Sequence, residues 1–250
     1  MKKEQNKYDF GWSLAWMNGY WIVGTIILVI ALWLLVNLSL LQILGVLLII
    51  ISLNLFGGNY VWRRSRSLDY LTLPYANLLS SDKDYVLDAC CGSGRTTIAL
   101  SKVIRDGHIV ALDRFDASYI KEGGRQLLEN NLKIAKKEDK VDIVKGDVTK
   151  LNFEDNTFDA IISAYALDHM GTIQLTTTLK ELNRVLKPAS RFLLIVFVPN
   201  LFTFLIANIM CLHLTSRKKW RKMFPKVGFA LSDEGIINGG AYFLLEKKSN

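Results

Sequence analysis

The chain has 250 residues, a formal net charge of +8 and a mean hydropathy of +0.21. This length allows one ordinary domain plus an additional segment. The apolar excess lies mainly between Tyr20 and Phe56, so the remainder has the composition of a globular domain. Cys90, Cys91 and Cys211 give neither a disulfide framework nor metal-ligand spacing, which predicts reduced thiols and no metal site.

The apolar segment predicts a pair of membrane-spanning helices. Residues 20–56 contain no Asp, Glu, Lys or Arg, and one straight helix of that length would measure about 55 Å. The hydrocarbon core is about 30 Å thick, so two helices fit better, over Trp16–Val36 and Leu40–Phe56. We expect the break near Asn37-Leu38-Ser39 and the end of the second helix at Gly57-Gly58. A cleaved signal peptide would be shorter, and a buried soluble hairpin would carry some charge.

The residues around these spans predict their orientation. Positive charge flanks both outer ends, and the connection between the spans carries none. Positive loops stay in the cytoplasm, so we expect an integral membrane protein with both termini and the following domain cytoplasmic. The basic residues are Lys2, Lys3, Lys7, Arg63, Arg64 and Arg66, and the expected interfacial aromatic residues are Trp12, Trp16, Tyr20, Trp21, Tyr60 and Trp62.

From about Asp84 the pattern changes to short β-runs that alternate with helical stretches, which predicts an α/β domain with a mostly parallel sheet. The expected strands are 85–88, 108–113, 141–145, 158–163 and 191–198, and the expected helices are 96–105, 118–136 and 172–186. Residues 229–237 and 241–246 read as an antiparallel pair. We therefore divide the chain into a membrane anchor (1–58), an amphipathic linker (59–82) and an α/β domain (83–250).

Acidic residues end the first strands of this domain. Asp88 closes a strand before the small-residue loop Ala89-Cys90-Cys91-Gly92-Ser93-Gly94, where a ligand can approach the backbone closely. Asp113 ends the next strand, where an acid either binds the hydroxyls of a ribose or caps the following helix. Asp147 follows the third strand, where it can accept a hydrogen bond from an adenine amino group. Thr97 stands where the dinucleotide-binding fingerprint has a third glycine, which disfavours hydride transfer with NAD.

Together with Phe158-Asp159 and Leu182–Pro188, these motifs resemble the class I S-adenosylmethionine-dependent methyltransferases. The stretch Gly146–Met170 is similar to the branch that contains quinone-biosynthesis methyltransferases. The resemblance covers about residues 84–247 and implies a Rossmann-like seven-stranded sheet. It implies S-adenosylmethionine as the cofactor and a binding site composed of Asp88, Cys90, Gly92, Gly94, Asp113, Arg114, Asp147, Val148 and Ser163.

Two positions depart from the family pattern. Cys90 stands where the family usually has glycine, and its Cβ lies close to the cofactor path, so the affinity for the cofactor is expected to change. Ala189-Ser190 replace a Gly-Gly pair that follows the Lys-Pro dipeptide. That turn is remote from the chemistry in the family.

The segment after the fourth strand is where acceptor-handling groups sit in this family. Asp168 and His169 are candidates for orienting or deprotonating the methyl acceptor, since histidine exchanges protons near neutral pH, and Tyr165 is a candidate for lining the site. The alternative is that Asp168 caps the next helix and His169 packs beside the cofactor.

Residues 201–222 are unusual for the family. An apolar run from Leu201 to Leu212 precedes the basic, Trp-bearing stretch Arg217–Lys222. The run is short for a span but suits a membrane-surface element, with an ordinary lid helix as the alternative. No motif of amino-methylating DNA enzymes or of protein arginine methyltransferases is present, and much of the positive charge flanks apolar segments, so nucleic acid is not the expected partner.

These features predict methyl transfer to an apolar or membrane-borne acceptor, such as a lipid, a quinone or a thiol, with the lipid bilayer as a partner. The alternative is a membrane-anchored module that binds the cofactor or a partner without turnover. Cys90 is the feature that favours the alternative, whereas the presence of Asp88, Asp113 and Asp147 favours the enzyme.

Overall fold

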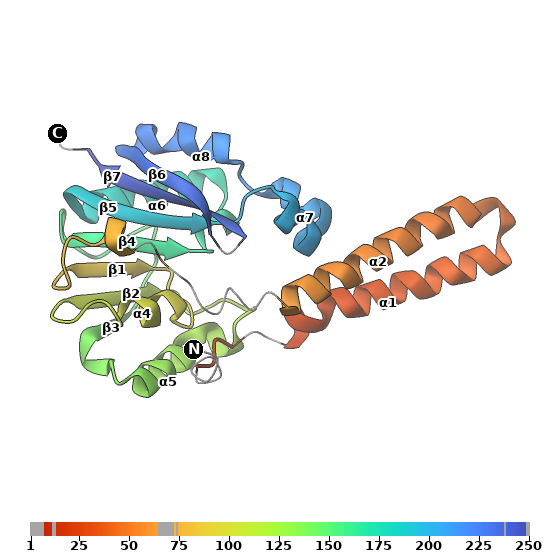
Figure 1. Ribbon diagram of the computed structural model, residues 1–250, viewed down its shortest axis with the longest axis horizontal. Coiled ribbons are helices and arrows are strands. Elements are labelled where there is room, and N and C mark those ends of the chain that lie inside the picture. Colours follow the sequence, from red (N-terminus) through yellow and green to blue (C-terminus); the bar gives the residue numbers. More distant parts are fainter. Residues whose placement is uncertain (1–7, 12–13, 65–72, 74, 238, 249–250) are drawn as a thin grey trace. The chain divides into compact units, whose positions relative to one another are not determined.

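The computed structural model describes residues 8–11, 14–64, 73, 75–237 and 239–248 (Figure 1). They fall into two compact units. The α/β unit comprises residues 1–11, 67–198 and 214–250, and the hairpin unit comprises residues 12–66 and 199–213. Tyr8–Gly11 therefore belongs with the α/β unit, and residues 199–213 belong with the hairpin, although the sequence suggested the opposite assignment for both.

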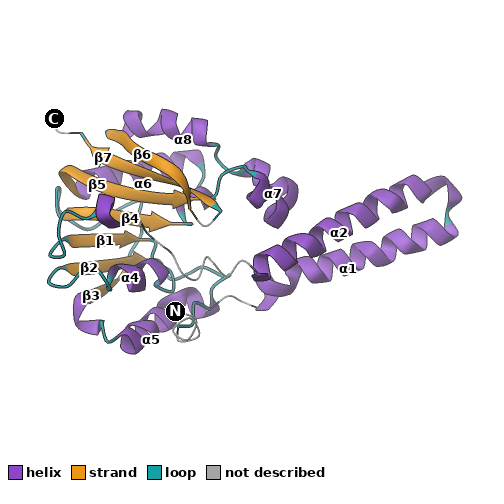
Figure 2. Cartoon of the chain, in the orientation of Figure 1, coloured by secondary structure: helices purple, strands orange, loops and turns teal. Residues whose placement is uncertain are grey.

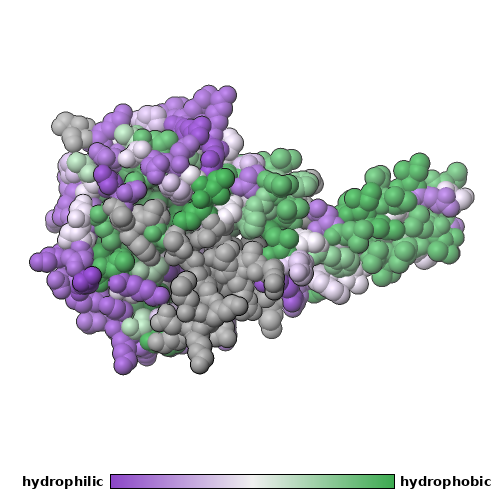
Figure 3. Space-filling model, viewed as in Figure 1, coloured by the Kyte–Doolittle hydropathy of each residue, from purple (hydrophilic) through white to green (hydrophobic). Residues whose placement is uncertain are grey.

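Two antiparallel helices form the hairpin unit (Figures 1 and 2). Helix α1 spans Leu14–Asn37 and α2 spans Gln42–Arg64, with the short helix η1 (Ser39–Leu41) between them, so the predicted break near residues 37–39 is confirmed. Residues 18–37 and 39–61 are long and apolar enough to cross a membrane, and only 17% of each is buried. Their apolar side chains form most of the hairpin surface (Figure 3). Lys2, Lys3, Lys7, Trp12 and Arg66 lie outside the described residues.

Small residues bring α1 and α2 together. A Cβ on Gly45 would lie 2.8 Å from Cγ of Leu35, and one on Gly24 would lie 3.0 Å from Cε1 of Phe56. The buried Ser52 hydroxyl donates a hydrogen bond of 2.8 Å to the carbonyl of Gly24. Close approach through small residues and interhelical hydrogen bonds is how helices associate in lipid, where apolar burial supplies little force.

The prediction that Gly57-Gly58 ends the second helix is wrong, because α2 continues to Arg64. The structure gives Gly58 a different role. A Cβ there would lie 2.4 Å from the carbonyl oxygen of Leu205, in helix α7 (Leu201–Ala207). The glycine therefore lets α7 pack directly against the backbone of α2, and the short helix η6 (Asn208–His213) continues from it.

A seven-stranded sheet forms the centre of the α/β unit, in the order β3-β2-β1-β4-β5-β7-β6. Strands β1 to β5 are parallel, and β7 runs antiparallel to both β5 and β6. Their bounds are Tyr85–Ala89, His108–Asp113, Val141–Lys145, Phe158–Ala164, Leu186–Val196, Phe229–Ile237 and Gly240–Lys247 for β1 to β7. The strand order reverses between β1 and β4, which is where ligands bind in open α/β sheets.

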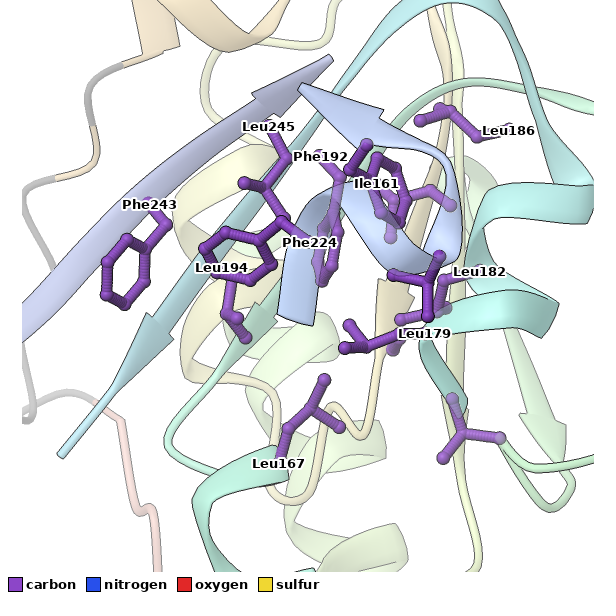
Figure 4. Close-up of a cluster of buried hydrophobic side chains, with 14 of the residues drawn as sticks. Ile161, Leu167, Leu179, Leu182, Leu186, Phe192, Leu194, Phe224, Phe243 and Leu245 are labelled. Carbon is purple, nitrogen blue, oxygen red and sulfur yellow. The ribbon is translucent and has the colours of Figure 1, made fainter. Parts of the chain in front are cut away.

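Helices cover both faces of this sheet, because the side chains of the buried strands alternate between two apolar clusters. One cluster joins the sheet to α3 (Tyr75–Leu78), α4 (Arg95–Leu100) and α5 (Arg125–Ala135). The other joins it to α6 (Thr172–Val185), α8 (Arg217–Met223) and η7 (Phe224–Val227), and Phe224 packs beside Phe243 there (Figure 4). The remaining short helices are η3 (Lys121–Gly124), η4 (Glu138–Lys140) and η5 (Leu167–His169).

Two helices are shorter than the sequence suggested. The helix expected over residues 118–136 begins only at Arg125, because Glu122, Gly123 and Gly124 adopt left-handed backbone angles. A Cβ at Gly123 would lie 2.0 Å from the carbonyl oxygen of Phe115, so this turn is tightly packed. The helix expected over residues 96–105 ends at Leu100 and continues as a turn.

The basic stretch Arg217–Lys222 is interpreted from the sequence as a membrane-surface helix with an interfacial tryptophan. That interpretation is wrong for Trp220. Trp220 is fully buried and packs against Phe224 and Phe243 in the core of the α/β unit. Arg221 pairs with Glu234 through an Nε–Oε2 contact of 2.9 Å. Helix α8 is therefore a core helix with a basic outer face.

The packing of α7 on α2 generates a prediction with a matched control. Gly58→Ala is expected to destabilise this contact, because the new methyl group meets a backbone oxygen that cannot rotate away. Gly57→Ala adds a methyl that meets nothing within 4 Å and gains about 1 kcal/mol of helix propensity. Hydrogen exchange in detergent micelles should show faster exchange of the α7 amides in Gly58→Ala than in Gly57→Ala, and equal exchange would contradict the contact.

Candidate functional site

The candidate site lies at the carboxyl ends of β1, β2, β3 and β4, on both sides of the point where the strand order reverses. The predicted strand-end acids meet at this edge. The Cys90 thiol lies on the loop after β1, where burial raises its pKa and the charges of Asp113, Asp88 and Asp147 raise it further. A thiol held protonated in this way is not a nucleophile, so we assign Cys90 no chemical step.

Left-handed residues shape the loop between β1 and α4. Cys90, Gly92 and Gly94 have φ angles of +65°, +52° and +88°. The amides of Cys90 and Cys91 both donate to the carbonyl of Leu112 in β2, at 2.8 and 3.1 Å. The backbone explains why the family usually has glycine at position 90. For a residue with a side chain, left-handed backbone angles cost roughly 1–2 kcal/mol.

Asp88 is fully buried at the end of β1. Its Oδ2 accepts a hydrogen bond of 2.6 Å from the hydroxyl of Thr97, and within the described part of the chain its buried Oδ1 has no partner. Burial raises the pKa of this carboxyl to about 7, and the nearby charge of Asp113 contributes. A buried acceptor without a partner is uncommon in folded proteins, and it suits a ligand that brings a cationic donor.

Asp113 ends β2 and is held by backbone amides on both sides. Its Oδ2 accepts from the amide of Gly92 at 2.9 Å, and its Oδ1 accepts from the amide of Phe115 at 2.7 Å. Burial raises its pKa, although both hydrogen bonds oppose the shift. Asp113 therefore ties the β1 loop to the β2 loop, and each carboxylate oxygen retains a lone pair for a ligand hydroxyl. The alternative that it caps a helix is wrong, because α5 begins at Arg125 after Gly124.

The third acid lies on the surface. Asp147 accepts from both the amide and the hydroxyl of Thr149, and these bonds lower its pKa. Arg114 reaches its Oδ2 at 3.9 Å. An open depression of about 320 Å³ lies between the β2 and β3 loops, lined by Arg114, Asp116, Lys145, Gly146 and Asp147. The predicted site residue Val148 is instead buried in the core beneath it.

The groups predicted to handle the acceptor follow β4. The Oδ2 of Asp168 accepts from the amide of Phe197 at 3.2 Å, and within the described residues its buried Oδ1 is unpartnered. Burial raises the Asp168 pKa, whereas the charge of His169 lowers it. The alternative that Asp168 caps the next helix is wrong, because Gly171 occupies the N-cap of α6 without a side-chain hydrogen bond. His169 itself is exposed.

Tyr165 and Ser163 occupy the same edge. Tyr165 has a φ of +56°, and its ring lies 4.6 Å from the ring of Phe197. Its hydroxyl donates to the carbonyl of Ile237 at 3.4 Å, and burial raises its pKa. Ser163 is fully buried in β4, and its hydroxyl has no partner among the described residues.

Two site residues were missed by the sequence reasoning. Thr97 was noted there only as a missing glycine, yet it is the hydrogen-bond partner of Asp88. The ring of Tyr119 lies 6.4 Å from that of His169, and burial together with the charges of Asp113 and Asp168 raises its pKa. Tyr119 therefore lies within electrostatic range of both Asp113 and Asp168. An aromatic residue in an irregular loop gives no sequence signal for such a position.

The stretch that resembles the quinone-biosynthesis branch, Gly146–Met170, is bound by Arg184 from the Leu182–Pro188 motif. Arg184, from Leu182–Pro188, donates to the carbonyls of Leu151 and Phe153 at 2.9 and 2.8 Å and pairs with Asp155 at 2.8 Å. Glu181 completes the set with a contact of 2.9 Å to Arg184. These motifs therefore fix the loop between β3 and β4.

The buried carboxyl of Asp88 generates a prediction for the pH dependence of stability. Because its folded pKa lies above the unfolded value, the folded state binds more protons between about pH 4 and 7, and stability falls as pH rises through that window. Asp88→Asn, which does not titrate, should match the wild type near pH 4 and exceed it at pH 8 by roughly 2–4 kcal/mol. Chemical unfolding at several pH values measures this, and parallel pH profiles would refute the buried, protonated state.

Cys90→Gly is expected to stabilise the protein, because glycine adopts the left-handed angle freely. The gain should be about 1 kcal/mol, reduced by the larger entropy of glycine in the unfolded chain. Cys91→Gly serves as the control. It removes a buried side chain from a residue that lacks a positive φ and should lower the unfolding midpoint. A lower midpoint for Cys90→Gly would show that the loop is not strained there.

Comparisons with known proteins agree with this geometry. Residues 86–189 match the methyltransferase domain family. A demethylmenaquinone methyltransferase of Staphylococcus saprophyticus is 36% identical over 117 residues, which cover 45% of this chain and 43% of that protein. One from Staphylococcus aureus (strain MRSA252) is 36% identical over 107 residues, covering 41% and 38%. The matched region thus spans less than half the length of these curated relatives.

Solved structures share the fold at low identity. A SAM-dependent methyltransferase from Aquifex aeolicus has a TM-score of 0.57 at 17% identity, covering 76% of this chain and 97% of that one. The [4+2]-cyclase SpnF has a TM-score of 0.58 at 14% identity, covering 75% and 81%. Residues 86–189 thus match a methyltransferase domain family, and the α/β unit shares the fold of these solved structures.

Proposed function

We propose that this protein is a membrane-anchored methyltransferase that transfers a methyl group from S-adenosylmethionine to an apolar or membrane-borne small molecule. The observation that carries the proposal is the buried, half-satisfied carboxylate of Asp88, which lies in one cluster with Asp113 and Asp147. The same chain carries two helices that are long and apolar enough to cross a membrane.

The residues at the sheet edge fit the parts of this cofactor. The free Oδ1 of Asp88 suits an ammonium group, and the oxygens of Asp113 suit two hydroxyls. The depression between Arg114 and Asp147 suits a planar base, with Asp147 accepting from its amino group. Gly92 and Gly94 have no side chains, so a ligand can approach the loop backbone closely, and Ser163 in β4 has a buried hydroxyl. When bound, S-adenosylmethionine supplies an electrophilic methyl group on a sulfonium.

Positioning an acceptor supplies much of the rate of such a transfer, and we assign this task to residues after β4. Asp168, with its unpartnered buried oxygen, orients a hydroxyl or an amine by accepting its hydrogen. The exposed His169 removes a proton where the acceptor must lose one, and Tyr165 lines the site. An acceptor that needs no deprotonation requires only the orienting contact.

The proposed acceptor class rests on the relatives and on the hairpin unit. The curated relatives are named for demethylmenaquinone, which favours a quinone over a lipid amine or a thiol. On α7 and η6, the side chains of Leu201, Phe204 and Leu212 are 74%, 42% and 73% exposed, as expected for an element that lies against lipid. We propose that this element draws the acceptor from the bilayer, and that both termini and the α/β unit are cytoplasmic.

The rival function is a membrane-anchored module that binds the cofactor or a partner without turnover. One observation favours it, since Cys90 holds a positive φ of +65° in the loop after β1. A fold alone does not fix the reaction, so the two functions must be separated by turnover.

Calorimetric titration of the full-length, detergent-purified protein with S-adenosylmethionine and S-adenosylhomocysteine tests the proposal. We expect binding that weakens about tenfold per unit of pH below 7, because the cationic group needs an ionised Asp88. Asp113→Ala should abolish binding, and Asp113→Asn, which can still accept from Phe115, should weaken it. Folded protein that binds neither compound removes the proposal.

Labelled methyl donor with liposomes that contain a demethylated quinone, an aminophospholipid or an aliphatic thiol then identifies the acceptor. Leu201→Ser with Phe204→Ser should lower transfer to the liposome-borne acceptor and leave the affinity for S-adenosylhomocysteine unchanged. Ile173→Ser, at another exposed apolar residue (86% exposed), is the control. Binding without transfer to any acceptor would establish the rival module.

A further inference from the structure

Four residues that precede the membrane hairpin pack on the α/β unit. We call Tyr8–Gly11 the strap. The ring of Phe10 is buried, with the guanidinium carbon of Arg95 5.4 Å from its centroid. The strap therefore contacts the first residue of α4. This residue directly follows the loop between β1 and α4 (residues 90–94), which we call the cofactor loop. By sequence, two residues separate Gly11 from the start of α1 at Leu14.

Asn131 on α5 joins the strap to the cofactor loop. Its Oδ1 accepts from the amide of Asp9 at 3.0 Å, and its Nδ2 donates to the carbonyl of Asp9 at 2.8 Å and to the carbonyl of Ser93 at 3.1 Å. The side chain is 1% exposed. A buried amide with this many partners holds both segments at a fixed distance, because losing either segment leaves it unsatisfied.

A second pair of hydrogen bonds closes the connection. The buried hydroxyl of Ser93 donates to the carbonyl of Phe10 in the strap at 3.0 Å. Ser93 therefore contacts the strap directly through its side chain and indirectly, through Asn131, by its backbone carbonyl. The amide of Lys121 donates to the carbonyl of Gly11 at 2.9 Å. Gly11 has a φ of +66°, and a Cβ there would lie 2.0 Å from Cδ1 of Leu127. The strap can therefore pack in this position only if its last residue is glycine.

Ser93 stands between Gly92 and Gly94, the two left-handed glycines of the loop. Three left-handed residues in five cost conformational entropy and strain, so a loop of this kind needs external contacts to hold one shape. Its contacts on the sheet side come from Leu112 and Asp113. On the other side they come from Asn131 and the strap.

We infer that the strap, acting through Asn131 and Ser93, positions the Cys91–Arg95 loop for cofactor binding, so the segment that leads into the first membrane helix is part of the cofactor site. This inference rests on the proposed function. Its thermodynamic consequence is reciprocal. If a docked strap favours cofactor binding, bound cofactor must favour the docked strap by the same factor. A strap that served only as a tether would show neither effect.

The test uses the full-length protein in detergent and compares Gly11→Ala with Gly19→Ala. Gly19 is a matched control because a Cβ there meets nothing within 4 Å. We expect Gly11→Ala to weaken S-adenosylhomocysteine binding about 5- to 50-fold, the range of typical coupling, and Gly19→Ala to leave it unchanged. The double variant Tyr8→Ser with Phe10→Ser removes the strap's aromatic side chains and should weaken binding at least as much.

Hydrogen exchange distinguishes a strap that positions the loop from a strap that only stabilises the fold. In the wild type, S-adenosylhomocysteine should slow exchange of the Asp9 and Lys121 amides, and in Gly11→Ala the loop amides of residues 91–95 should exchange faster before ligand is added. Wild-type affinity in both strap variants, or strap amides that ignore the ligand, would overturn the inference. A wild type that binds no ligand would instead overturn the proposed function, and exchange of the loop amides would still decide whether the strap holds the loop.

Discussion

The arrangement of the α/β unit depends on one buried carboxylate. Asp88 ends β1 at the point where the strand order reverses, and it is fully buried with one oxygen bonded to Thr97 and the other unpartnered among the described residues. Burying an acid costs free energy unless it is neutral or paired, and burial accordingly raises the pKa of Asp88 to about 7. Because of this raised pKa, Asp88 lowers the stability of the folded state as pH rises toward neutrality.

The loop after Asp88 is held from two directions. On the sheet side, Leu112 accepts from two loop amides and Asp113 accepts from Gly92. On the other side, Asn131 accepts and donates hydrogen bonds that end on Ser93 and on the strap. Each anchor comes from a different part of the chain, so the loop's shape is a property of the whole α/β unit. Cys90 fits this account, since the neighbouring contacts hold it in a left-handed conformation that it would not adopt alone.

The sequence predicted the features that have local or periodic signals. The sheet, its strand-end acids and the two apolar helices follow from alternation, spacing and hydropathy, and the structure agrees. Features that depend on distant contacts were missed or misread. Gly57-Gly58 looked like a helix end because nothing in the sequence shows Leu205 beside Gly58. Trp220 looked interfacial among its lysines, yet Phe224 and Phe243 bury it. The departures at Cys90 and Ala189 were noticed as changes of residue type, whereas the structure shows that both residues have a positive φ, of +65° and +59°, which favours glycine.

Each unit also takes in a segment from the part of the sequence that mainly forms the other. Tyr8–Gly11 packs on the α/β unit, and residues 199–213 pack with the hairpin. The chain therefore passes between the units more than once along the sequence. Two of these connections are close in sequence to functional groups, since Gly11 ends the strap and Phe197 donates its amide to Asp168. The ends of the hairpin unit are therefore continuous in sequence with the segments that contact the loop after β1 and Asp168.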